Sequence, residues 1–158
     1  FVEYAFSDTL AIGVDYIPMS ADVSDKTKKR TDVETSVTGT TTETTTSRAQ
    51  SAQAELKNHV TLYANYGLTD STYFKAGVAM VSLETDESLA TGSTYGNEDI
   101  FGGVVGFGAE QNGVRVELLY TDYEQVNLTS SATRAGVTNK TKIDADLDTL
   151  AIKLSYAF

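Results

Sequence analysis

Apolar and polar residues alternate one by one in repeated segments along this chain, and this pattern limits its fold more than any other feature. Seven segments show the alternation: residues 2–6, 10–16, 60–67, 74–81, 101–108, 114–121 and 150–158. Successive side chains of a β-strand point to opposite faces, so a period of two marks strands with one apolar face. Helical periodicity is hard to find anywhere. We therefore predict an all-β fold with seven visible strands.

The connections between these segments alternate between short and long. Residues 7–9, 69–71 and 111–113 are short, whereas residues 20–52, 86–98 and 127–142 are long and polar. Asn112-Gly113 is the strongest hairpin signal of the short connections. This rhythm predicts an antiparallel up-and-down meander with short turns at one end and long loops at the other. The longest loop contains a threonine-rich tract at residues 40–46, which we expect to be mobile or to form extended β-arms.

The two faces of the predicted strands differ in composition. One face mixes glycines with charges of both signs, which suits a narrow interior in which buried charges pair with one another. Its charged members are Glu3, Asp15, Lys75, Glu110, Arg115, Glu117 and Lys153. The other face carries aliphatic residues between two levels of aromatic residues. That arrangement matches the lipid-facing exterior of a transmembrane β-barrel with its two aromatic girdles.

The last segment alternates apolar residues and ends in phenylalanine. Leu154, Tyr156 and Phe158 resemble the C-terminal insertion signal of Gram-negative outer-membrane barrels. Taken with the rhythm of turns and loops, the whole chain resembles the small eight-stranded barrels of the OmpA/OmpX-like families in pattern and topology. The resemblance implies a single transmembrane β-barrel domain over residues 1–158 in a bacterial outer membrane. It also implies contact with lipid and lipopolysaccharide, and recognition by the barrel-assembly machinery.

The resemblance fixes the direction of the strands. The C-terminus of such barrels lies in the periplasm, so the long loops, including residues 20–52, would be extracellular. Eight strands are expected and seven are visible. We therefore expect the first strand to be missing, with either a gap or a strand from another chain between residues 1–6 and 144–158.

Composition excludes several classes of function. The chain has no cysteine and a single histidine, His59, which leaves little basis for a catalytic site, and we expect no enzyme activity. Its net charge of −10 argues against a nucleic-acid partner. We expect a structural envelope role, with exposed loops for surface contacts or adhesion. A narrow porin-like channel and a soluble lipocalin-like carrier remain alternatives.

Outward-facing acids gather just above the upper aromatic level. On the last two predicted strands these are Asp122, Glu124, Asp146 and Asp148. Hard divalent cations prefer clusters of carboxylate oxygens. The expectation is a Ca²⁺ or Mg²⁺ rim that bridges these acids to lipopolysaccharide phosphates or to a neighbouring envelope or surface protein. The alternative is a hydrated acidic rim with diffuse counterions.

Overall fold

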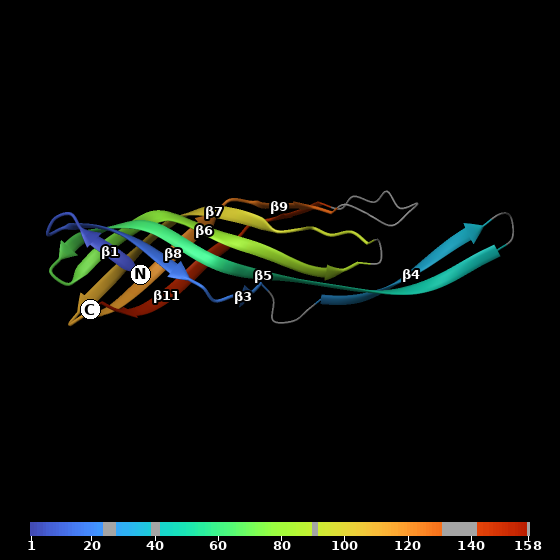
Figure 1. The fold of residues 1–158 in the computed structure, drawn as a ribbon, viewed down its shortest axis with the longest axis horizontal. Helices are drawn as coiled ribbons and strands as arrows, with labels where there is room; N and C mark the ends of the chain where they lie inside the picture. Colours follow the sequence, from blue (N-terminus) through green and yellow to red (C-terminus); the bar gives the residue numbers. More distant parts are fainter. Residues whose placement is uncertain (24–27, 39–41, 90–91, 131–141, 158) are drawn as a thin grey trace.

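The fold consists of antiparallel β-strands. A computed structural model describes residues 1–23, 28–38, 42–89, 92–130 and 142–157. The main sheet has the order β1-β2-β5-β6-β7-β8-β11 (Figure 1). Its strands are β1 Val2–Ala5, β2 Leu10–Ile17, β5 Thr42–Thr69, β6 Thr72–Ser88, β7 Glu98–Gln111, β8 Val114–Tyr123 and β11 Asp148–Tyr156. This order confirms the predicted all-β antiparallel meander.

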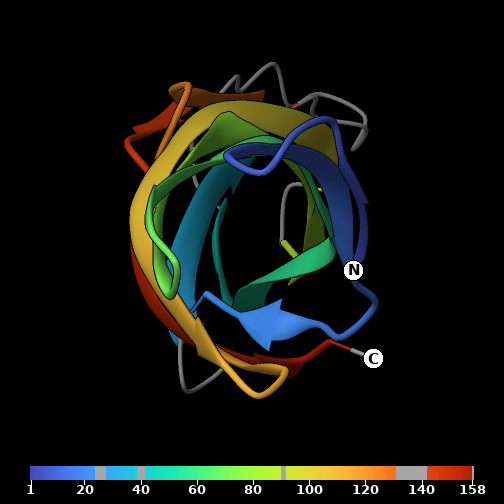
Figure 2. The same cartoon turned by 90° about the vertical axis from the view of Figure 1, so that its left-hand side faces the viewer.

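The main sheet curves around a common axis without closing (Figure 2). It therefore has an inner and an outer face. Ion pairs on the inner face join β1 to β8 and β2 to β11, so its two ends approach each other. The two edge strands are β1 and β11, and no strand among the described residues pairs with their free edges. Because neighbouring strands are antiparallel and the path holds seven, β1 and β11 run in the same direction.

Three short connections lie at one end of the sheet, which we call the turn end. The chain reverses there after β1, between β5 and β6, and between β7 and β8. In the last of these turns Asn112 has φ 53° and Gly113 has φ 78°. A two-residue hairpin turn whose twist matches that of its strands requires two successive residues in the left-handed conformation. The predicted hairpin at this position is confirmed.

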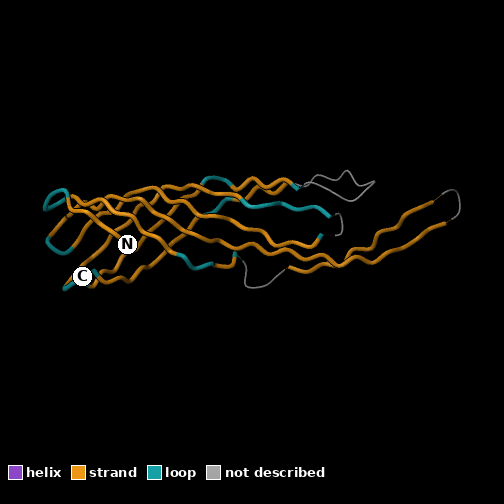
Figure 3. The backbone as a smooth tube through the Cα atoms, viewed as in Figure 1, coloured by secondary structure: helices purple, strands orange, loops and turns teal. Residues whose placement is uncertain are grey.

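The opposite end, which we call the loop end, contains additional strands. β3 Ala21–Asp22 and β4 Lys28–Thr38 both pair with β5, and β4 forms a hairpin arm with the first part of β5 that projects beyond the sheet (Figure 3). Residues 42–46 of the threonine-rich tract lie in this arm, in the extended form expected for the tract, and residues 40 and 41 lie outside the described residues. β9 Val126–Thr129 and β10 Lys142–Ala145 form a separate two-stranded sheet at the two ends of the predicted third loop. The described residues include no helix long and apolar enough to cross a membrane.

The inner face is polar in its turn half and apolar in its loop half. Its loop half is an apolar cluster of Ala79, Val81, Leu83, Ile100, Val104, Tyr123, Val126 and Leu128. One reason is a β-bulge in β5 between Lys57 and Val60, where Asn58 has φ 54°. An extra residue exchanges the faces of the side chains on its two sides. Leu56 therefore pairs with Leu83 on the inner face, although it has the same parity as Val60.

Candidate functional site

The seven charged residues predicted to face the interior lie together on the inner face of the turn half. Six of the seven main strands contribute to this group, which we call the charged cluster. Its members are Glu3, Asp15, Lys75, Glu110, Arg115, Glu117 and Lys153. Acids and bases alternate within it, so each buried charge has an opposite charge within reach.

The most deeply buried pair of the cluster is Lys75 and Glu117. Their side chains are 2% and 1% exposed, and Lys75 Nζ lies 2.5 Å from Glu117 Oε1. Tyr73 Oη donates a hydrogen bond of 2.7 Å to the same carboxylate. Lys153 Nζ lies 3.9 Å from Glu117 Oε2 and also forms an ion pair with Asp15. These contacts supply the partners that charges removed from water require.

Arg115 forms the second centre of the cluster. Its Nη1 lies 2.9 Å from Glu3 Oε2, and its Nη2 lies 2.6 Å from Glu110 Oε2. Glu3 Oε2 also accepts hydrogen bonds from Tyr63 Oη at 3.1 Å and from Asn65 Nδ2 at 2.8 Å. Charge-assisted hydrogen bonds of this kind are stronger than neutral ones. The arrangement fixes β1 against β5 and β8 across the inner face.

Tyr63, Asn65 and Tyr73 belong to the cluster but were not predicted as members. The available signal was their parity, because each occupies an inward position and carries a polar tip. Glycines make room for the two tyrosine rings: a Cβ on Gly13 would lie 2.5 Å from Tyr63 Oη, and a Cβ on Gly108 would overlap the Tyr73 ring. The mixture of glycines and charges therefore reflects packing of large rings inside a narrow space.

The outer face is apolar on all seven main strands. On β11, Leu150, Ile152 and Leu154 are 74%, 79% and 73% exposed, and all three pair in register with outward apolar residues of β8. We call this surface the apolar belt. It consists of the exposed residues Val2, Tyr4, Leu10, Ile12, Val14, Tyr16, Leu62, Tyr66, Leu68, Val78, Phe101, Val105, Phe107, Val114, Val116, Leu118, Tyr120, Leu150, Ile152, Leu154 and Tyr156.

Two residues of the expected insertion signal belong to this belt. Leu154 and Tyr156 are exposed on the outer face, and Phe158 lies outside the described residues. Aromatic residues contact one another at the turn end, where the rings of Phe74 and Phe107 lie 5.4 Å apart, edge to face.

The four acids of the expected cation rim are all exposed: Asp122, Glu124, Asp146 and Asp148. Asp122 and Asp148 are register partners on β8 and β11, so two like charges stand directly opposite each other. Glu124 is turned toward β7, where its Oε1 accepts the N–H of Phe101 at 3.0 Å. Within the described part of the chain, no group of three or more His, Cys, Asp or Glu side chains is arranged to hold a metal ion.

A second pair of facing acids shows how such repulsion is relieved elsewhere. Glu55 and Glu84 are register partners on β5 and β6. Lys57 Nζ lies 2.6 Å from Glu84 Oε2 and 3.3 Å from Glu55 Oε2. A hydrogen bond to Glu84, and a weaker effect of a hydrogen bond to Glu55, raise the pKa of the Lys57 amine. Among the described residues, no lysine or arginine forms such an ion pair with Asp122 or Asp148.

Comparisons of the chain with protein-family models, with curated proteins and with solved structures found no match. The charged cluster, the apolar belt and the acidic rim are therefore the features that bear on function.

Proposed function

We propose that the protein is an integral outer-membrane β-barrel with a structural role in the envelope and with exposed loops for surface contacts. One observation carries this proposal: the charges are inside and the apolar side chains are outside. Lys75 is 2% exposed whereas Ile152 is 79% exposed. A soluble monomer rarely exposes a continuous apolar patch larger than a few hundred Å². A belt that crosses all seven main strands far exceeds a local patch and suits a lipid environment.

A membrane setting requires the sheet to close, because unpaired backbone groups are too costly in lipid. Strands β1 and β11 run in the same direction and are the two free edges of the described sheet. One more strand, antiparallel to both, would pair with each of them. We propose that this strand completes an eight-stranded barrel.

The charged cluster favours a structural barrel over an open channel. Small barrels fill their interior with side chains, and here paired charges occupy the turn half. A soluble lipocalin-like carrier would place its apolar strand face inside, which is opposite to the side on which the apolar belt lies. In the proposed orientation the β4–β5 arm extends outward from the cell, where it would contact lipopolysaccharide or a neighbouring surface protein.

Membrane fractionation in a Gram-negative host tests the proposal. The protein should require detergent for extraction and should migrate faster on a gel before heating than after heating. In planar bilayers it should give no steady conductance; regular single-channel openings would instead favour a channel. Recovery in the aqueous fraction without detergent would contradict the membrane assignment.

The absence of cysteine allows a direct test of orientation. Ser47 is an exposed residue of the β4–β5 arm, and Asp70 is exposed in the turn between β5 and β6. A membrane-impermeant maleimide should label Ser47→Cys in intact cells, and Asp70→Cys only after the outer membrane is disrupted. The reverse pattern would show that the barrel is inverted.

A further inference from the structure

The loop half of the inner face contains an apolar pocket that is separate from the charged cluster. Its volume is about 320 Å³, and its walls come mainly from β5, β6, β9 and β10. Leu83 follows Lys75 by eight residues on β6, which corresponds to about 26 Å along the strand. Its lining includes Leu56, Leu83, Glu87, Val126, Leu128 and Asp146.

The size and walls of this pocket suit a small molecule. Ligand sites typically have volumes of about 300–1,000 Å³ and mostly apolar walls. Leu83, Val126 and Leu128 are among the buried residues of the apolar cluster, so they form firm walls. Cavities with such walls hold water poorly. A ligand with an apolar body would therefore displace little bound water.

A second cavity of about 500 Å³ shares Leu56 with the pocket and extends to Lys75. It is also bounded by Ile152 and Leu154 of the outer face, at the free edge of the sheet. Its shape therefore depends on the strand proposed to close the barrel. The first pocket is lined by no residue of β1, β2 or β11, because Asp146 and Leu147 precede β11. It therefore does not depend on that closure.

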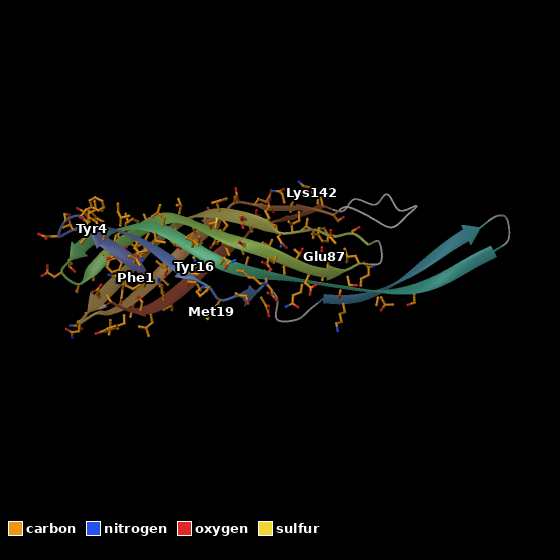
Figure 4. The ribbon with its side chains drawn as sticks, in the orientation of Figure 1. Phe1, Tyr4, Tyr16, Met19, Glu87 and Lys142 are labelled. Carbon is orange, nitrogen blue, oxygen red and sulfur yellow. The ribbon has the colours of Figure 1, made fainter. Side chains whose placement is uncertain are left out.

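The polar groups of the pocket define the charge of the ligand. Glu87 Oε1 accepts the N–H of Tyr95 at 2.5 Å, whereas Glu87 Oε2 is buried and has no hydrogen-bond partner among the described residues. Asp146 adds a second carboxylate to the lining, and none of the described lining residues is a lysine, arginine or histidine. An unsatisfied buried acceptor is costly, and an ammonium group would satisfy it with a charge-assisted hydrogen bond. Figure 4 shows Glu87 toward the loop end, far along the molecule from Tyr4 at the turn end.

We propose that this pocket binds a cationic amphiphile, an amine with a short alkyl or aromatic body. The ammonium group would pair with Glu87, and the apolar body would lie against Leu56, Leu83 and Leu128. This binding activity goes beyond the structural role proposed above. It depends on the local packing of the loop half and not on the medium around the outer face.

Calorimetric titration with three eight-carbon probes tests the proposal. Octylamine, 1-octanol and octanoate differ only in the head group and its charge. The protein is reconstituted in lipid nanodiscs, and empty nanodiscs provide the blank. Octylamine should bind at least tenfold more tightly than octanoate, with 1-octanol between them. If the protein does not insert into lipid, the proposed membrane function fails, and the same titrations on the lipid-free protein still decide the binding proposal.

Two variants separate the head-group contact from the apolar contact. Glu87→Gln should abolish the preference for octylamine and leave the affinity for 1-octanol unchanged. Leu128→Trp should fill the pocket and weaken binding of both probes at least tenfold, whereas the matched control Leu150→Trp on the outer face should not. Circular dichroism establishes that each variant is folded. Absence of octylamine binding, a preference for octanoate, or equal binding by Leu128→Trp and Leu150→Trp would overturn the proposal.

Discussion

Replacing Lys75 by methionine should destabilise the protein by about 3 kcal/mol. Methionine keeps much of the apolar stem of lysine, so the change isolates the charge. Glu117, 1% exposed, would lose its nearest cation, while keeping the hydrogen bond from Tyr73 and the more distant Lys153 at 3.9 Å. Breaking a buried ion pair costs about 3–5 kcal/mol. The lower end of that range is expected because these two contacts remain.

A double variant tests whether the cost arises from the carboxylate left without its partner. Lys75→Met combined with Glu117→Gln removes both charges and retains an acceptor for Tyr73. It should recover about 2 kcal/mol of the loss, and adding the single variant Glu117→Gln to the set gives the coupling energy of the pair in a double-mutant cycle. The control is Lys142→Met: Lys142 pairs with Asp144, and these side chains are 59% and 45% exposed. An exposed pair contributes about 0–1 kcal/mol.

The free energy of unfolding can be measured by denaturant titration in lipid vesicles. The chain has nine tyrosines and no tryptophan, so tyrosine fluorescence reports on the whole sheet, with circular dichroism as a second probe. Equal stabilities of Lys75→Met and Lys142→Met would refute the reasoning, because they would mean that Lys75 is not buried against Glu117.

Three further results are expected. Gly108→Val should cost about 1–3 kcal/mol by overlapping the Tyr73 ring, and the same substitution should cost less when it is made in a Tyr73→Ala chain, as measured in the same titration. Ile152→Lys should destabilise the protein in vesicles by about 2–4 kcal/mol, whereas Asp148→Lys at the rim, which places a cation opposite Asp122, should not destabilise it; equal costs would contradict a lipid-facing belt. Millimolar calcium should raise the melting temperature and a chelator should reverse it. Asp122→Asn should abolish this response, and an unresponsive wild type would exclude a cation between the facing acids.

The faces of the turn half could be predicted because strand side chains have a period of exactly two residues. Once Lys75 and Arg115 were assigned to the inner face, Glu117 and Lys153 followed from the same alternation. The identity of each partner could not be predicted in this way. Lys153 meets Asp15 because β11 approaches β2 across the curved sheet, and that approach depends on curvature and twist, which alternation does not encode.

The loop half could not be predicted because β-bulges leave little trace in an alternating sequence. Leu56 and Val60 have the same parity, so alternation alone would place both on one face, yet the bulge at Asn58 turns Leu56 inward. A similar change separates β8 from β9, where Tyr120 faces outward and Val126 faces inward. The local signal at the first site was Asn58, since asparagine tolerates a positive φ better than most residues.

These changes of face determine both where the apolar belt ends and where the pocket begins. Below the bulge, Val60 and Met80 are partners on the outer face; above it, Leu56 and Leu83 are partners on the inner face. The outer positions above the bulge are then free to carry charge, and Glu55 occupies one of them beside Lys57. One inserted residue therefore produces a charged outer rim and an apolar inner wall at the same level. A membrane barrel needs the charged outer rim to position itself at the lipid boundary. The apolar inner wall has no role in lipid contact, and for this reason a ligand is the better explanation for the pocket.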